Sequence, residues 1–157
     1  MGDARLLWTF SAVLDVPFAK AKSLLFHVPA DREGKPMLPF VLRWGQSTVA
    51  SGQWDIRGGP EQFTIRYGPK TLDSRLRLEL HQAEARWIVQ GNWWYRGECE
   101  LAPLERGCEL TYRVYDATGN PAWLMSLFHR FNHHRAKVKR DFDRLVQAVY
   151  QHIGLEE

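Results

Sequence analysis

The hydrophobic pattern near the start of the chain has a period of two. In "RLLWTFSAVLD" every second position from residue 6 to residue 14 is apolar, and these side chains would share one face of an extended segment: Leu6, Trp8, Phe10, Ala12 and Leu14. Alternation of this kind is typical of a strand with one buried face. The sequence therefore predicts a long first strand over this segment.

The pattern changes in "VPFAKAKSLLFHV", where apolar side chains recur every three or four residues. Asp15 and Pro17 suit the start of a helix. The spacing predicts one apolar face: Phe18, Ala21, Leu25 and Val28. A loop follows at "PADREGKP". In "MLPFVLRW", Pro39 argues against a long helix, so this segment predicts either a short helical turn or the entry to the next strand.

Six further strands are predicted in residues 47–116. They are separated by short turns, several of which contain Gly or Pro, and their segments are "STVASGQWDIR", "EQFTIRY", "SRLRLELH", "ARWIVQ", "WYRGECELAP" and "CELTYRVYD". Connections this short favour antiparallel neighbours.

The last two of these strands form a predicted hairpin, with Gly107 at a turn position that favours positive φ. A turn centred on Glu105 and Arg106 would pair Cys108 with Pro103 and not with Cys99. We therefore expect both cysteines to be small core residues, not a disulfide.

The C-terminal part predicts one long helix. Asn120 suits the N-cap and Pro121 the first helical position, and Gly154 follows the end. Apolar side chains recur in steps of three and four, except that Arg135 takes one place in the series. The series is Leu124, Phe128, Phe131, Val138, Phe142, Leu145 and Val149.

The predicted order is thus strand, one or two short helices, six strands and a long helix. A curved antiparallel sheet needs its concave side filled, and one amphipathic helix can fill it. The opening "SAVLDVPFAKAKSLLF" and the closing "NPAWLMSLFHRF" fit this order. Over nearly the whole chain it resembles the helix-grip fold of the SRPBCC superfamily: START-related lipid-binding proteins, plant allergen-like proteins, polyketide cyclases and coenzyme-Q-binding homologues.

The resemblance implies an α+β domain spanning residues 1–157. In it, a curved antiparallel sheet of about seven strands would wrap around the long C-terminal helix and leave a ligand cavity between them.

Composition fits a globular protein, with 45% hydrophobic and 25% charged residues among 157. No apolar run approaches the roughly 18 residues of a membrane helix, and the N-terminus lacks a signal-peptide pattern, so we expect a cytoplasmic protein. The net charge is +3, yet residues 123–144 hold six Lys or Arg against two Asp. An acidic partner would therefore meet the basic side of the last helix.

Candidate ligand-binding residues are the inward-facing side chains of the strands and of the last helix. They are Trp8, Phe10, Trp54, Phe63, Leu78, Trp87, Tyr112, Phe128, Phe131, Arg135, Val138 and Phe142. Such side chains can pack a solid core or line an apolar pocket, and the resemblance favours the pocket. No catalytic residue is predicted, since no nucleophile elbow, phosphate loop or carboxylate pair is present; Asp55, His81, Gln53 and Tyr112 are the polar candidates.

Two features of the last helix leave alternatives open. Arg135 either faces the cavity and binds a ligand's anionic group, or reaches out to solvent while His134 or nothing fills its place. His129 and His133 are four residues apart and could face one ligand. A metal site requires three or four ligands, however, and the flanking arginines would repel a cation. We expect solvent-facing or partly packed histidines, no metal site and no cofactor.

The expected function is the binding, transport or sequestration of a hydrophobic small molecule such as a lipid, a quinone or a polyketide-like aromatic. One alternative is a cyclase, dehydratase or hydrolase in the same cavity, which polar side chains within hydrogen-bond reach of one another would favour. The other is a partner-binding module that uses the basic helix face, for which weak contact with an anionic membrane is favoured over nucleic acid.

Overall fold

A computed structural model describes residues 4–26, 32–33, 54–67, 75–91 and 94–156. The strands are β1 (Arg5–Leu14), β2 (Arg32–Glu33), β3 (Trp54–Gly58), β4 (Gln62–Tyr67), β5 (Arg75–His81), β6 (Arg86–Gly91), β7 (Tyr95–Pro103) and β8 (Cys108–Asp116). The helices are α1 (Phe18–Leu25), the short 3-10 turn η1 (Gln82–Glu84), α3 (Ala122–Phe131) and α4 (His134–Glu156).

The strands form one antiparallel sheet in the order β1-β8-β7-β6-β5-β4-β3-β2. Apart from the pair of β1 with β8, each strand lies beside the next in sequence. The short turns predicted this from β3 to β8, whereas β2 lies in the segment "PADREGKP" that was expected to be a loop. The β7–β8 hairpin pairs Pro103 with Cys108 and Cys99 with Tyr112. Both cysteines are free and buried, which confirms the predicted pairing and their place in the core.

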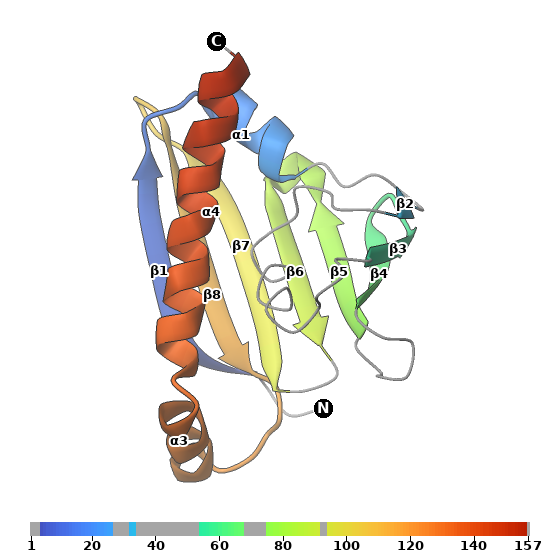
Figure 1. Ribbon diagram of the computed structural model, residues 1–157, viewed down its shortest axis with the longest axis vertical. Coiled ribbons are helices and arrows are strands. Elements are labelled where there is room, and N and C mark those ends of the chain that lie inside the picture. The colour runs from blue at the N-terminus through green and yellow to red at the C-terminus, as the bar shows by residue number, and fades with distance from the viewer. Residues whose placement is uncertain (1–3, 27–31, 34–53, 68–74, 92–93, 157) are drawn as a thin grey trace.

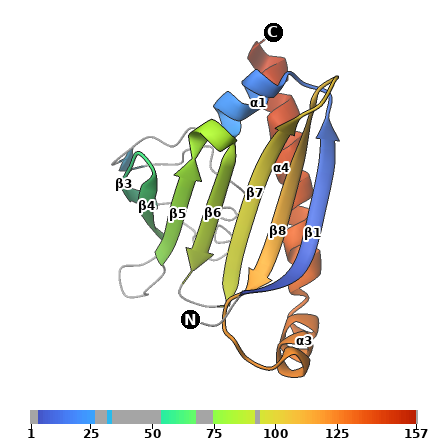
Figure 2. The same ribbon diagram turned by 180° about the vertical axis from the view of Figure 1, so that it is seen from behind.

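Helix α4 covers one face of this sheet. Figure 1 shows α4 lying along β1 and β8 with α1 near its C-terminal end, and Figure 2 shows the opposite face of the sheet from behind. In β6, β7 and β8 every second residue is buried, because only one face meets the core. The curved antiparallel sheet and the long C-terminal helix form the predicted α+β helix-grip architecture.

The first strand departs from strict alternation at one point. Its pairing with β8 shifts register between Leu6 and Trp8, so Leu6 is exposed although Phe10 and Leu14 are buried on the same predicted face. A bulge moves the side chains before it to the other face. The prediction therefore holds for the strand but fails for Leu6.

The prediction of one long C-terminal helix is wrong, because the chain breaks into α3 and α4. Asn132 caps α3, and His133 has a positive φ of 53° before α4 begins at His134. A left-handed residue cannot continue an α-helix. The predicted apolar series crosses this break. Its members on α3 therefore do not lie on the same helix face as its members on α4. No helix among the described residues is long and apolar enough to cross a membrane.

The first helix begins where the sequence predicted. Pro17 is the N-cap, and Ala21 and Leu25 are buried beneath the helix. Phe18 packs partly buried against the core, whereas Val28 and the segment "MLPFVLRW" lie outside the described residues.

Candidate functional site

Most of the predicted ligand-binding side chains lie together on the inner face of the sheet or on α4. The buried members are Phe10, Phe63, Leu78, Trp87, Tyr112, Val138 and Phe142, and Trp8 is partly buried against them. The Phe142 ring stacks with Phe10 and Tyr112, at centroid distances of 6.0 and 6.5 Å. The side chain of Trp54 lies outside the described part of the chain.

Two tyrosine hydroxyls converge on this otherwise apolar wall above Gly97. Tyr95 and Gly97 lie two residues apart on β7, and Tyr112 is on the neighbouring strand β8. A Cβ placed on Gly97 would lie 2.6 Å from the Tyr95 hydroxyl and would also strike the Tyr112 hydroxyl. Glycine thus leaves the space that both hydroxyl groups share. The two hydroxyl groups thus form one polar site among the aromatic side chains of the inner face.

The surroundings of Tyr95 keep its hydroxyl protonated. Burial, followed by the nearby Cys99 and Asp141, raises the pKa of Tyr95 well above its usual value. Burial also raises the pKa of the Cys99 thiol, despite a backbone hydrogen bond at Glu100 that lowers it. A neutral phenol can donate a hydrogen bond to a ligand oxygen, but neither group is primed as a nucleophile.

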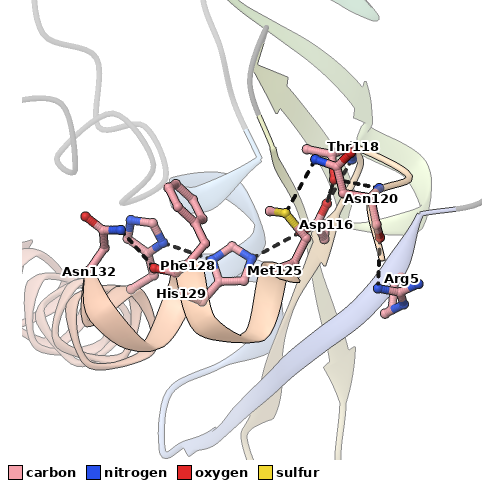
Figure 3. Close-up of polar contacts among 9 residues, drawn as sticks. Arg5, Asp116, Thr118, Asn120, Met125, Phe128, His129 and Asn132 are labelled. Atoms are coloured by element: carbon pink, nitrogen blue, oxygen red, sulfur yellow. Dashed lines mark hydrogen bonds and ion pairs between the residues drawn. The ribbon is translucent and has the colours of Figure 1, made fainter. Parts of the chain in front are cut away.

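A second polar cluster lies at the end of the same wall, where β8 leads into α3. His129 Nε2 is 3.1 Å from Asp116 Oδ2, and His129 Nδ1 is 2.9 Å from His134 Nδ1. Figure 3 shows His129 bridging from α3 towards Asp116. The Asp116 Oδ1 atom accepts hydrogen bonds from Thr118 N–H and Oγ1–H, at 2.8 and 2.6 Å.

These contacts set the protonation of the cluster. Burial favours the neutral Asp116, but hydrogen bonds from Thr118 and His129 outweigh it and lower the pKa of this carboxyl group. Burial, then His129 and Lys137, lowers the pKa of His134 to about 4. The ionised Asp116 accepts a hydrogen bond from His129 Nε2–H, and the Nδ1 atoms of His129 and His134 share a second hydrogen bond.

Aromatic rings enclose the two histidines. Trp94 lies edge-on to His129 at 4.3 Å between ring centroids and stacks on His134 at 4.9 Å. Trp8 packs against His129 from β1, and Phe128 contacts both imidazoles. Trp94 also touches the Tyr95 ring, at 5.5 Å. The histidine cluster and the tyrosine pair are therefore connected through one tryptophan.

The structure corrects the prediction for one of the two histidines considered for a metal site. His129 is buried, with 5% of its surface exposed, whereas a solvent-facing or partly packed side chain was expected. His133 is exposed, as expected. The physical reason is that Asp116 supplies a buried acceptor for His129. Among the described residues, no group of three or more His, Cys, Asp or Glu side chains is arranged to hold a metal ion.

The break between the helices also corrects the predicted facing of Phe128 and Phe131. Both are exposed on α3, whose buried side chains are instead Met125 and His129. Arg135 is exposed as well, with its guanidinium carbon 5.9 Å from the centroid of the Phe10 ring. The outward alternative for Arg135 is thus the observed one, and His134 is the buried residue beside it.

The polar candidates for a catalytic role do not gather in one place. Tyr112 is buried, while His81 is exposed with Glu79 at 3.6 Å. The side chains of Gln53 and Asp55 lie outside the described part of the chain.

An open groove of about 610 Å³ lies on the sheet face turned away from α4. Paired strands bring a row of polar side chains into its lining: Arg57, Thr64, Arg77, Gln90 and Arg96. The lining also includes Phe63 and Leu78, two of the predicted ligand-binding residues, so polar and apolar groups both contribute to this groove.

Sequence reasoning missed the residues that organise both polar clusters. Gly97 stands inside a predicted strand between Tyr95 and Cys99, and a glycine there often marks a close approach of other groups. Asp116 ends the last strand directly before a turn. The partnership of Asp116 with His129 depends on which face of α3 is buried, and the apolar series predicted Phe128 and Phe131 on that face instead of Met125 and His129.

Comparison with known proteins finds likeness in structure alone. No family model matches the sequence, and no curated protein matches it. Ara h 8.0201 is similar with a TM-score of 0.47 and 10% identity, over 95% of this chain and 99% of that protein. The Polyketide_cyc-like protein Cgl2372 from Corynebacterium glutamicum has a TM-score of 0.47 and 16% identity, over 99% of this chain and 95% of its own. The helix-grip assignment rests on the sheet order and on the position of α4.

Proposed function

We propose that the protein binds a hydrophobic small molecule between the inner face of the sheet and α4. A lipid, a quinone or a polyketide-like aromatic has the required character. The observation that supports this most is the pair of hydroxyl groups, from Tyr95 and Tyr112, that converge above Gly97 on an aromatic wall. Ligand pockets combine apolar walls with a few placed polar groups in this way.

The two kinds of surface would have different effects on binding. Apolar contact with rings such as Trp87 and Phe142 would supply affinity, at roughly 25 cal/mol for each Å² removed from water before ordering costs. The Tyr95 and Tyr112 hydroxyls would orient a carbonyl, hydroxyl or ring oxygen of the ligand. A pure hydrocarbon would therefore bind without a fixed orientation.

Native mass spectrometry and solvent extraction of the purified protein test this proposal. We expect an apolar compound to be released, and an oxygen-bearing aromatic probe to bind about tenfold more weakly to Tyr112→Phe, which is the loss of roughly one hydrogen bond. Tyr115→Phe is the matched control. Tyr115 lies on the opposite face of β8 from the buried Tyr112, and its hydroxyl donates to Glu98. The proposal is wrong if no compound is released and no apolar probe binds.

A second candidate function is an enzyme that uses the Asp116–His129 pair. A carboxylate that holds one imidazole nitrogen orients the other as a general base, and here that nitrogen meets His134 at 2.9 Å. Turnover of aromatic esters that His129→Gln abolishes, while ligand binding persists, would support this function. Equal rates with and without the protein would exclude ester hydrolysis.

A further inference from the structure

One side of α3 carries a stripe of exposed apolar residues. Trp123 and Phe131 expose 68% and 79% of their surfaces. At 3.6 residues per turn the stripe spans an arc of about 140°. Its members, the α3 stripe, are Trp123, Leu124, Leu127, Phe128 and Phe131.

The opposite side of α3 fixes which way this stripe faces. Met125 and His129 are buried, and His129 is tied to Asp116 at the end of β8. Arg5 on β1 donates to the Asn120 carbonyl just before the helix, at 3.4 Å. Figures 1 and 2 both show α3 beyond the ends of β1 and β8, next to the start of α4. The stripe is therefore presented outward on a supported helix.

Positive charge borders the α3 stripe. Residues 117–140 contain five Lys or Arg and no Asp or Glu. Arg130 lies about 20° from Trp123 around the helix, and exposed Arg135 and Lys137 follow at the start of α4. Exposed Trp, Leu and Phe beside cationic side chains are the composition of helices that lie in the interface of an anionic bilayer. Two copies meeting through this surface would instead bring like charges together.

We propose that α3 docks the protein on the surface of an anionic lipid bilayer. The α3 stripe enters the headgroup region, and Arg130 and Arg135 contact lipid phosphates. This role goes beyond the proposed ligand binding and does not depend on it, because the stripe residues are exposed on α3, whereas the proposed ligand contacts are buried side chains of the sheet and α4.

Sedimentation with vesicles tests the apolar part of the proposal. The full-length protein should bind vesicles of phosphatidylcholine with phosphatidylserine, and the double variant Trp123→Ser, Phe131→Ser should bind at least tenfold more weakly. The matched control is Val13→Ser, Leu104→Ser, since both residues are exposed and apolar but lie at the other end of the sheet. All variants should keep the melting temperature of the parent, because every changed residue is exposed.

The double variant Arg130→Gln, Arg135→Gln tests the electrostatic part of the proposal. This variant should lose most of the difference between phosphatidylserine-containing and pure phosphatidylcholine vesicles, and added salt should reduce that difference in the parent protein. Lys139→Gln is the control, since Lys139 is already paired with Asp143 at 3.0 Å on α4.

A dye on Phe131→Cys reports insertion directly. Its emission should shift to the blue with anionic vesicles, while a dye on Leu104→Cys should not shift; the native cysteines are buried and do not compete. The proposal is overturned if the folded parent does not bind anionic vesicles at low salt. It is also overturned if ultracentrifugation shows a dimer that the Trp123→Ser, Phe131→Ser variant converts to monomer, since a second copy then covers the stripe.

Discussion

Gly97 shows how a single missing side chain shapes the interior. Tyr95 on β7 and Tyr112 on β8 place their hydroxyl groups in the space that a side chain at Gly97 would occupy. A methyl group at this position would have to displace buried side chains, because the interior is close-packed. The buried Gly97 is therefore required for the arrangement of Tyr95 and Tyr112.

Gly97→Ala should lower the free energy of unfolding by about 1–3 kcal/mol, since the new methyl group overlaps the two hydroxyls. Urea denaturation followed by circular dichroism measures this loss. Combining it with Tyr112→Phe should restore part of the stability, because the overlap with one hydroxyl is removed. Additive losses in the double variant would contradict the proposed overlap.

At the scale of elements, the division of the last helix matters most. The sequence predicted the apolar face of α4 correctly, because Val138, Phe142, Leu145 and Val149 keep their spacing and are buried. The expected ends differ, since Pro121 and not Asn120 is the N-cap of α3, and α4 continues past Gly154 to Glu156. The sequence could not predict the break, because nothing in "RFNHHRA" is a proline or glycine. The left-handed His133 lies between His129 and His134, whose Nδ1 atoms meet at 2.9 Å.

The same substitution, Phe to Ala, should change the free energy of unfolding by very different amounts on the two helices. Phe142→Ala on α4 should cost about 3–5 kcal/mol of unfolding free energy, since this ring is 3% exposed and stacks with Phe10 and Tyr112. Phe131→Ala on α3 should change it by less than about 0.5 kcal/mol, since that ring is 79% exposed. Denaturant titrations of both variants give the comparison. Similar losses would mean that Phe131 is buried in solution.

At the scale of the whole molecule, the order and the pairing of strands follow from local signals. Alternation and short turns specify antiparallel neighbours, and the β7–β8 register follows from the turn at Glu105 and Arg106. The Asp116–His129 contact depends on how α3 packs against the end of β8. The hairpin register brings Tyr95 and Tyr112 onto neighbouring strands, but the period-two pattern does not show that their hydroxyls meet at Gly97.

The same clusters make stability depend on pH. His134 ordinarily has a pKa of 6.5, but in the folded protein it is lowered to about 4. As pH falls from 6.5 to 4, the unfolded chain gains a proton that the folded protein resists, so the free energy of unfolding should fall across this window. The lowered pKa of Asp116 adds a loss only at more acidic pH.

Urea midpoints over this pH range should fall less steeply for His134→Gln than for the parent. The groups around His134 are His129 on α3, Lys137 on α4 and, through His129, Asp116 on β8. His133→Gln is the control, because His133 is exposed at the helix break. An unchanged slope in His134→Gln would assign the effect to other groups.

Arg5 pairs with Asp116, so the start of β1 lies at the end of β8, close to α3. This position decides how a tag or label at either end of the chain would affect binding to lipid. The start of β1 lies beside α3, whereas the 23 residues of α4 carry the C-terminus about 35 Å further along the helix axis. A bulky N-terminal tag would therefore crowd the stripe and weaken adsorption to lipid for steric reasons alone. A C-terminal fluorophore stands clear of the surface, and energy transfer from it to labelled lipid would report which end of the molecule faces the membrane.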